Sequence, residues 1–81
     1  MKARIFVTLK NGVLDPQGKA VQGALSSMGF SEAADVRVGK YMEIVLKDDG
    51  RSKAECTERV RQMCEKLLAN TVVENYRVEI D

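Results

Sequence analysis

The stretch VRVGKYMEIVL, residues 36–46, decides which fold this sequence can adopt. Its even-numbered positions are apolar, namely Val36, Val38, Met42, Ile44 and Leu46. Because side chains in a strand alternate between the two faces of a sheet, a two-residue hairpin on Gly39-Lys40 would place the first two of these on the wrong face. The pattern therefore excludes the tight hairpin. Either a three-residue loop over residues 39–41 or one long strand through Gly39 satisfies it.

Two other segments alternate between apolar and polar residues, as half-buried strands do. One is residues 3–10, and the other is residues 72–80. The residues expected to face the core are Ile5, Val7 and Leu9 in the first segment and Tyr76, Val78 and Ile80 in the second. Each end of the sequence therefore supplies one strand.

The first helix is predicted to begin at Asp15 and Pro16. An aspartate carboxylate accepts the free amide hydrogens of a first helical turn, and proline fits the first helical position because its missing N–H is not needed there. Gly29 is expected to end the helix in the left-handed conformation. An apolar stripe at helical spacing, which we expect to cover the sheet, consists of Val21, Ala24, Leu25 and Met28.

The second helix is predicted to follow the turn Asp48-Asp49-Gly50 and to run to about Ala69. Ser52 and Glu55 form a capping box at its start. Its buried face is expected to consist of Cys56, Val60, Met63, Cys64 and Leu67. The two cysteines would lie about 12 Å apart along the helix, which is too far for a disulfide.

The resulting order of elements is βαββαβ, a ferredoxin-like succession that predicts an α+β fold, a two-layer sandwich of an antiparallel sheet and two helices. A core made by 81 residues is small, which favours association. If the chain runs straight through Gly39, its halves lie too far apart to share one sheet, and each copy would complete its sheet with a neighbour's segment. We therefore predict a segment-swapped dimer. The alternative is a self-contained monomer with a three-residue loop.

The composition excludes most catalytic chemistry. The chain has no histidine, its two cysteines do not make a zinc site, and no Gly-rich loop offers a phosphate cradle. We expect no catalytic residue, cofactor or metal in this chain. The net charge of +1 is spread along the sequence, which argues against nucleic acid, and no apolar run reaches the length of a membrane span. These features predict a soluble, cytoplasmic protein.

Two segments indicate contact with a partner. The first is the turn Asp15, Pro16, Gln17 and Gly18, which helix initiation also explains. The second comprises Arg37, Gly39, Lys40 and Tyr41, which would otherwise be solvated strand residues. Gly18 and Gly23 each weaken the first helix by about 1 kcal/mol relative to alanine, which suggests either close approach of another backbone or simple tolerance.

Three strings resemble the PurS family, the small subunit of phosphoribosylformylglycinamidine synthase. They are LKNGVLDPQGKAVQGALSSMGF (residues 9–30), DVRVGKYMEI (residues 35–44) and CEKLLANTVVENYRVEI (residues 64–80). The resemblance covers nearly the whole chain as one domain, residues 1–81, and is weakest over residues 47–59. Its strings occur in the same order as in the family.

The resemblance implies a place in a purine-biosynthesis complex. In that family a glutaminase subunit releases ammonia, and a large synthetase subunit uses ATP and magnesium to form the amidine. The small subunit bridges the two, assists ammonia transfer, acts as a dimer and has no catalytic residues of its own. An ACT-like sensor of small molecules and a weak nucleic-acid binder share the order of elements and remain as alternatives.

Overall fold

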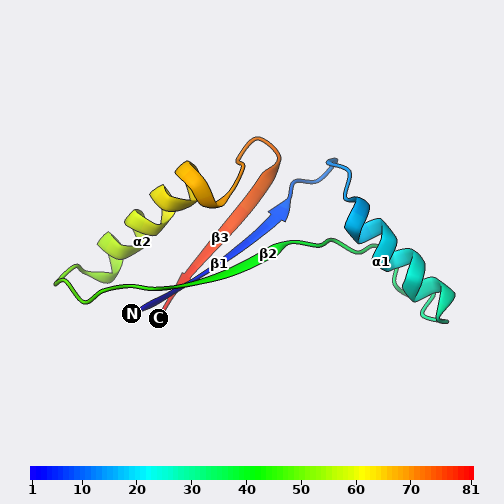
Figure 1. The fold of residues 1–81 in the computed structure, drawn as a ribbon, viewed down its shortest axis with the longest axis horizontal. Coiled ribbons are helices and arrows are strands. Elements are labelled where there is room, and N and C mark those ends of the chain that lie inside the picture. The colour runs from blue at the N-terminus through cyan, green and yellow to red at the C-terminus, as the bar shows by residue number, and fades with distance from the viewer.

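The computed structural model describes residues 1–81 and contains a three-stranded antiparallel sheet with two α-helices. Figure 1 shows that one helix lies along the sheet and that the other projects beyond its end. The elements follow one another as β1 (Lys2–Leu9), α1 (Pro16–Ser27), β2 (Lys40–Val45), α2 (Lys53–Met63), the π-helical segment η1 (Cys64–Leu68) and β3 (Glu74–Ile80). The predicted α+β class with an antiparallel sheet is confirmed.

The core lies on one face of the sheet, which has the strand order β2-β1-β3. Ala3, Ile5 and Val7 of the central strand are almost completely buried. Ile5 pairs with Met42 of β2 on one side and with Val78 of β3 on the other. The predicted alternation of the outer strands places their apolar residues on this same face, where α2 packs against them.

The predicted order βαββαβ is wrong by one strand, since the structure has βαβαβ. Residues 34–39 belong to no helix or strand, and β2 begins only at Lys40. No backbone hydrogen bond joins residues 36–38 to residues 42–44, so the three-residue loop is absent. The chain runs straight through Gly39, which is the continuous course that the even-numbered pattern allowed.

The second helix begins as predicted, with Ser52 and Glu55 forming the capping box. Val60 and Cys64 are fully buried against the sheet, but Leu67 is 82% exposed, contrary to prediction. The cause is η1, because a π-helical turn contains more residues than an α-helical turn and so shifts the side chains that follow. Leu68, one position later, packs on the core in place of Leu67.

The first helix has the predicted ends but not the predicted position. Gly29 follows it with φ of 97°, yet α1 does not cover the sheet, and Met28 in its apolar stripe is 71% exposed. The molecule is therefore elongated, measuring 52 × 24 × 14 Å with a radius of gyration of 16.3 Å. A compact chain of this length would have a radius of gyration of about 12 Å. The two-layer sandwich is consequently only half formed within one chain.

Neither helix is long and apolar enough to cross a membrane.

Candidate interaction surfaces

A buried carboxylate holds the start of α1. One oxygen of Asp15, Oδ1, accepts the Gly18 N–H at 2.8 Å, and Oδ2 accepts the Val38 N–H at 2.9 Å. The guanidinium Nε of Arg37 lies 3.9 Å from the same Oδ2. The two backbone donors hold the pKa of Asp15 below its ordinary value, and Arg37 adds to the effect. We call these four residues the Asp15 clasp.

Arg37 also ties the clasp to the end of β1. Its guanidinium donates to the carbonyl oxygens of Lys10 at 3.0 Å, Val13 at 3.3 Å and Leu9 at 3.4 Å. Carbonyl oxygens at the end of a strand would otherwise need water as a donor. Arg37, which the sequence placed on a partner surface, therefore has a role within its own chain.

Two of the glycines fit where no other residue would. A Cβ atom on Gly18 would lie 2.1 Å from the carbonyl oxygen of Val36, and one on Gly39 would lie 2.2 Å from the carbonyl oxygen of Val7. Gly23, in contrast, has no neighbouring atom within 4 Å of such a position. Close approach of another backbone thus explains Gly18 and Gly39, whereas Gly23 faces open space.

The other predicted site residues divide between two places. Pro16, Gln17 and Lys40 line an open cavity of about 340 Å³ beside the clasp, where Lys40 also lies 3.7 Å from a carboxylate oxygen of Glu74. Tyr41 points to the opposite face of the sheet and is absent from this cavity. The structure thus gathers seven of the eight predicted residues around the start of α1.

Tyr41 belongs to an aromatic cluster on the outer face of the sheet. Its ring lies 5.0 Å from that of Phe6, and the guanidinium of Arg77 lies 4.1 Å from the centre of the Phe6 ring. The Tyr41 hydroxyl donates to Glu43 at 2.8 Å, which raises the pKa of Tyr41 and lowers that of Glu43. Three ion pairs surround the cluster, namely Lys2 with Glu43, Arg4 with Asp81 and Arg77 with Glu79.

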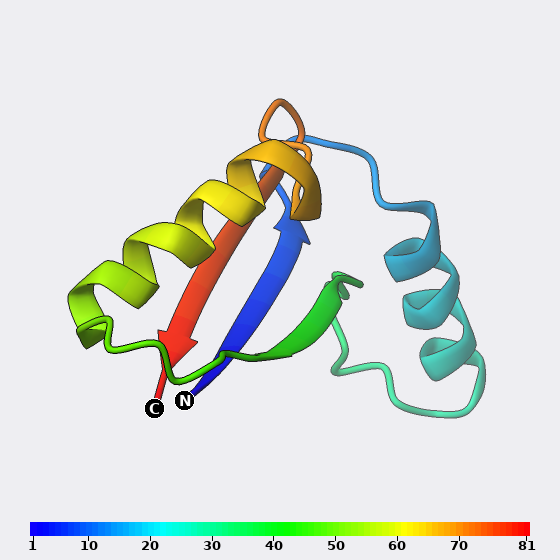
Figure 2. The same cartoon turned by 60° about the vertical axis from the view of Figure 1, so that its left-hand side comes forward.

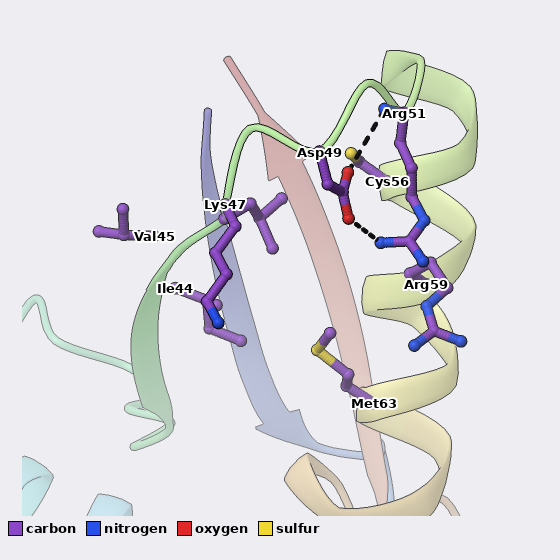
Figure 3. Close-up of a pocket in the computed structure, with 9 residues that line it drawn as sticks. Ile44, Val45, Lys47, Asp49, Arg51, Cys56, Arg59 and Met63 are labelled. Atoms are coloured by element: carbon purple, nitrogen blue, oxygen red, sulfur yellow. Dashed lines mark hydrogen bonds and ion pairs between the residues drawn. The ribbon is translucent and has the colours of Figure 1, made fainter.

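A groove that the sequence analysis missed runs between β2 and α2 (Figure 3). It encloses about 270 Å³ above an apolar floor, and cationic side chains stand on its rim. The floor is Ile44, Leu46, Cys56 and Met63, and the rim cations are Lys47, Arg51 and Arg59. Asp49 pairs with Arg51. Each floor residue was predicted to face the core. The groove stays open in this chain because α1, which was predicted to cover the sheet, projects beyond its end (Figure 1).

The first helix carries a second exposed apolar surface. Its stripe faces outward, since Val21, Met28 and the following Phe30 are all exposed large apolar residues. The edge of β2 away from β1 has no neighbouring strand. Apolar side chains and an unpaired strand edge are both surfaces that other chains bind.

The chain brings together no group of three or more His, Cys, Asp or Glu side chains that would hold a metal ion. Cys56 and Cys64 are free and buried, and burial raises the pKa of the Cys64 thiol, which disfavours the reactive thiolate.

Fold and surfaces together define a class: a small α+β interaction protein that leaves one helix and one sheet edge open to other chains. The sequence model of the family described as PurS, phosphoribosylformylglycinamidine (FGAM) synthase, matches residues 2–81. The PurS subunit of phosphoribosylformylglycinamidine synthase from Bacillus subtilis strain 168 is 52% identical over 80 residues, covering 99% of this chain and 92% of that protein.

Solved structures agree. PurS of Methanocaldococcus jannaschii, described as a subunit of formylglycinamide ribonucleotide amidotransferase in the purine biosynthetic pathway, has a TM-score of 0.86 at 35% identity, covering 99% of this chain and 94% of that one. A chain in the structure of PurLQS from Thermotoga maritima has a TM-score of 0.78 at 31% identity, covering 96% of this chain and 93% of that one.

The chain belongs to the PurS family. The resemblance drawn from the three sequence strings is thereby confirmed, and with it the prediction of a subunit of phosphoribosylformylglycinamidine synthase. The ACT-like alternative is not favoured.

Proposed function

We propose that this chain is the small, non-catalytic subunit that bridges the glutaminase and the ATP-dependent synthetase of phosphoribosylformylglycinamidine synthase. The observation that carries the proposal is family membership over residues 2–81, together with a PurLQS structure that contains a similar chain. The two free, buried cysteines are compatible with the reducing cytoplasm, where we expect the complex to work.

A bridging subunit has a physical reason to exist in such an enzyme. Ammonia released into water is diluted and protonated, so the site that makes it and the site that uses it must be held in a fixed relation. A subunit that keeps the two active sites together assists ammonia transfer without performing chemistry. ATP and magnesium then belong to the synthetase, not to this chain.

We further propose that two copies form a segment-swapped dimer. Three surfaces support it: the open edge of β2, the groove between β2 and α2, and the exposed stripe on α1. A second copy would place its residues 36–38 along the β2 edge and its α1 stripe over the groove. The ferredoxin-like sheet with two helices on one face would then be complete in each half of the dimer.

The surface around the start of α1 is the proposed contact with the larger subunits. Pro16, Gln17 and Lys40 supply exposed side chains to it. The clasp residues Asp15, Gly18 and Arg37, together with Gly39, give this surface its shape. Tyr41 would contribute separately, from the outer face of the sheet.

Reconstitution tests the bridging role. Purified glutaminase and synthetase subunits are mixed with and without this chain, and glutamine-dependent amidine formation is measured. We expect activity only when the chain is present, whereas amidine formation from added ammonia should need the synthetase alone. Equal glutamine-dependent rates with and without the chain would contradict the proposal, as would hydrolysis of glutamine or ATP by the chain by itself.

A further inference from the structure

The arm of the molecule, residues 11–38, comprises α1 and the extended segment after it, and Figure 2 shows it standing clear of the sheet. Its attachment is firmer than helix initiation requires. We propose that the Asp15 clasp determines which copy of the chain completes each sheet, because it holds the arm away from its own sheet. This inference rests on the swapped dimer proposed above.

The first argument concerns the second oxygen of Asp15. A helix cap needs only the bond from the Gly18 N–H, yet the carboxylate also accepts from Val38, 23 residues further along the chain. In a loop that folded back on β2, residues 36–38 would pair with residues 42–44 of the same chain. The clasp holds Val38 beside the start of α1, so residues 36–38 lead away from their own β2 and do not fold back along it.

The second argument concerns the length of chain between the arm and the sheet. Lys40 already pairs with Val7 of β1, so Gly39 alone separates the clasp from the first paired residue of β2. Gly39 itself lies against the carbonyl oxygen of Val7, where even a methyl group would not fit. Gly39, the connection between the arm and β2, is therefore fixed in place.

The third argument concerns the other connection, residues 10–14. Arg37 donates to the carbonyl oxygens of Leu9, Lys10 and Val13, so this loop is held by the segment that returns from α1. Within the arm, Gln22 Nε2 donates to the carbonyl oxygen of Ala34 at 2.7 Å. For α1 to reach its own sheet, the arm would have to turn as a unit about both connections. Fixed connections prevent this and favour exchange between copies.

Two variants separate this role from simple capping. In Asp15→Asn the side-chain oxygen still caps Gly18, but the amide NH₂ then faces the Val38 N–H and Arg37, which are donors. In Arg37→Gln the cap is untouched and the hold on residues 9–13 is lost. The control is Ser52→Ala, which removes the capping box of α2 and leaves the clasp intact.

The measurement is sedimentation velocity of the full chain over a wide micromolar range, with circular dichroism to establish folding. We expect a dimeric wild type, and a dimer dissociation constant raised at least about tenfold in Asp15→Asn and Arg37→Gln, with a folded monomer appearing. Ser52→Ala should melt at a lower temperature with an unchanged dissociation constant.

Other outcomes overturn the inference. An unchanged dissociation constant in both clasp variants, or an equal rise in Ser52→Ala, contradicts it while leaving the dimer intact. If Asp15→Asn does not fold, Arg37→Gln alone decides. A monomeric wild type would refute the dimer, and the clasp inference would fall with it.

Discussion

At the scale of single residues, the sequence predicted the cap at Asp15 but not the second bond of its carboxylate. Capping depends on residues within one turn, and these are adjacent in the sequence. The bond to Val38 joins residues 23 positions apart, and no local pattern reports it. Arg37 and Gly39 were assigned to a segment that contacts a partner, and the structure shows that both also make close contacts inside the chain.

Asp15 gives stability a specific dependence on pH. Its pKa is lower in the folded chain than the ordinary value of 3.8, so the unfolded chain binds this proton more tightly. The stabilisation is complete at neutral pH and is lost as the pH falls through that value toward the folded pKa. We expect wild type to lose stability on acidification more steeply than Asp15→Asn, in urea unfolding at a series of pH values.

Other carboxylates with lowered pKa values, Glu43 and Asp81, remain in both proteins, so the difference between the two acid profiles isolates Asp15. Parallel profiles for wild type and Asp15→Asn would show that the clasp does not favour the charged carboxylate.

Two glycines of one helix should respond in opposite directions to the same change. Gly18→Ala places a methyl group on the carbonyl oxygen of Val36 and should destabilise the fold by about 1–3 kcal/mol. Gly23→Ala meets open space and should stabilise α1 by up to about 1 kcal/mol. Denaturant unfolding of the two variants at equal concentration measures both, and a shift of the same sign in each would contradict the close approach at Gly18.

At the scale of elements, the ends of helices and the faces of strands were predictable, but their placement was not. Caps and alternation are local, so α1, α2, β1 and β3 begin near the expected residues. The π-helical segment was missed, since nothing in the residues around Cys64 distinguishes it from α-helix. The additional strand that was predicted is absent because residues 36–38 have no pairing partner within this chain, which no periodicity can reveal.

The π-helical segment predicts a contrast between adjacent leucines. Leu67→Ala should change the free energy of unfolding by less than about 0.5 kcal/mol, because its side chain is exposed. Leu68→Ala should cost about 2 kcal/mol, since Leu68 packs on the core. Urea unfolding compares the two directly. The reverse order would mean that the helix continues in α-helical register to Ala69, as the sequence alone suggested.

At the scale of the whole molecule, the elongated shape arises because the arm, residues 11–38, does not pack against the sheet of its own chain. The predicted two-layer sandwich implied a compact molecule. In one chain only α2 lies along the sheet (Figure 1), so only that part is compact. The predicted dimer reconciles the two, because the stripe on α1 and the groove beside β2 are both apolar. The dimer was predicted from residues 36–46, because the apolar residues on both sides of Gly39 occupy even-numbered positions, as in one continuous strand.

A charge on the α1 stripe tests the proposed contact between α1 of one copy and the groove of the other. Met28→Glu should weaken the dimer strongly, because a carboxylate would be buried against the apolar floor of the groove. Ser26→Glu adds the same charge in the same turn on an exposed side of α1, so it serves as the control. Sedimentation velocity of both variants gives the result. A dimer that tolerates both changes equally would exclude the stripe from the interface.

The open stripe of α1 also bears on how a cell would keep the amount of this subunit in balance. A chain without a second copy would display Val21, Met28 and Phe30 to the solvent and would keep only the half of its core that α2 covers. Such a chain would be open to proteases and chaperones, whereas the proposed dimer would bury the same residues. Surplus subunit would therefore be degraded as monomer, and the amount of subunit that remains in the cell would follow the amount that has formed dimers.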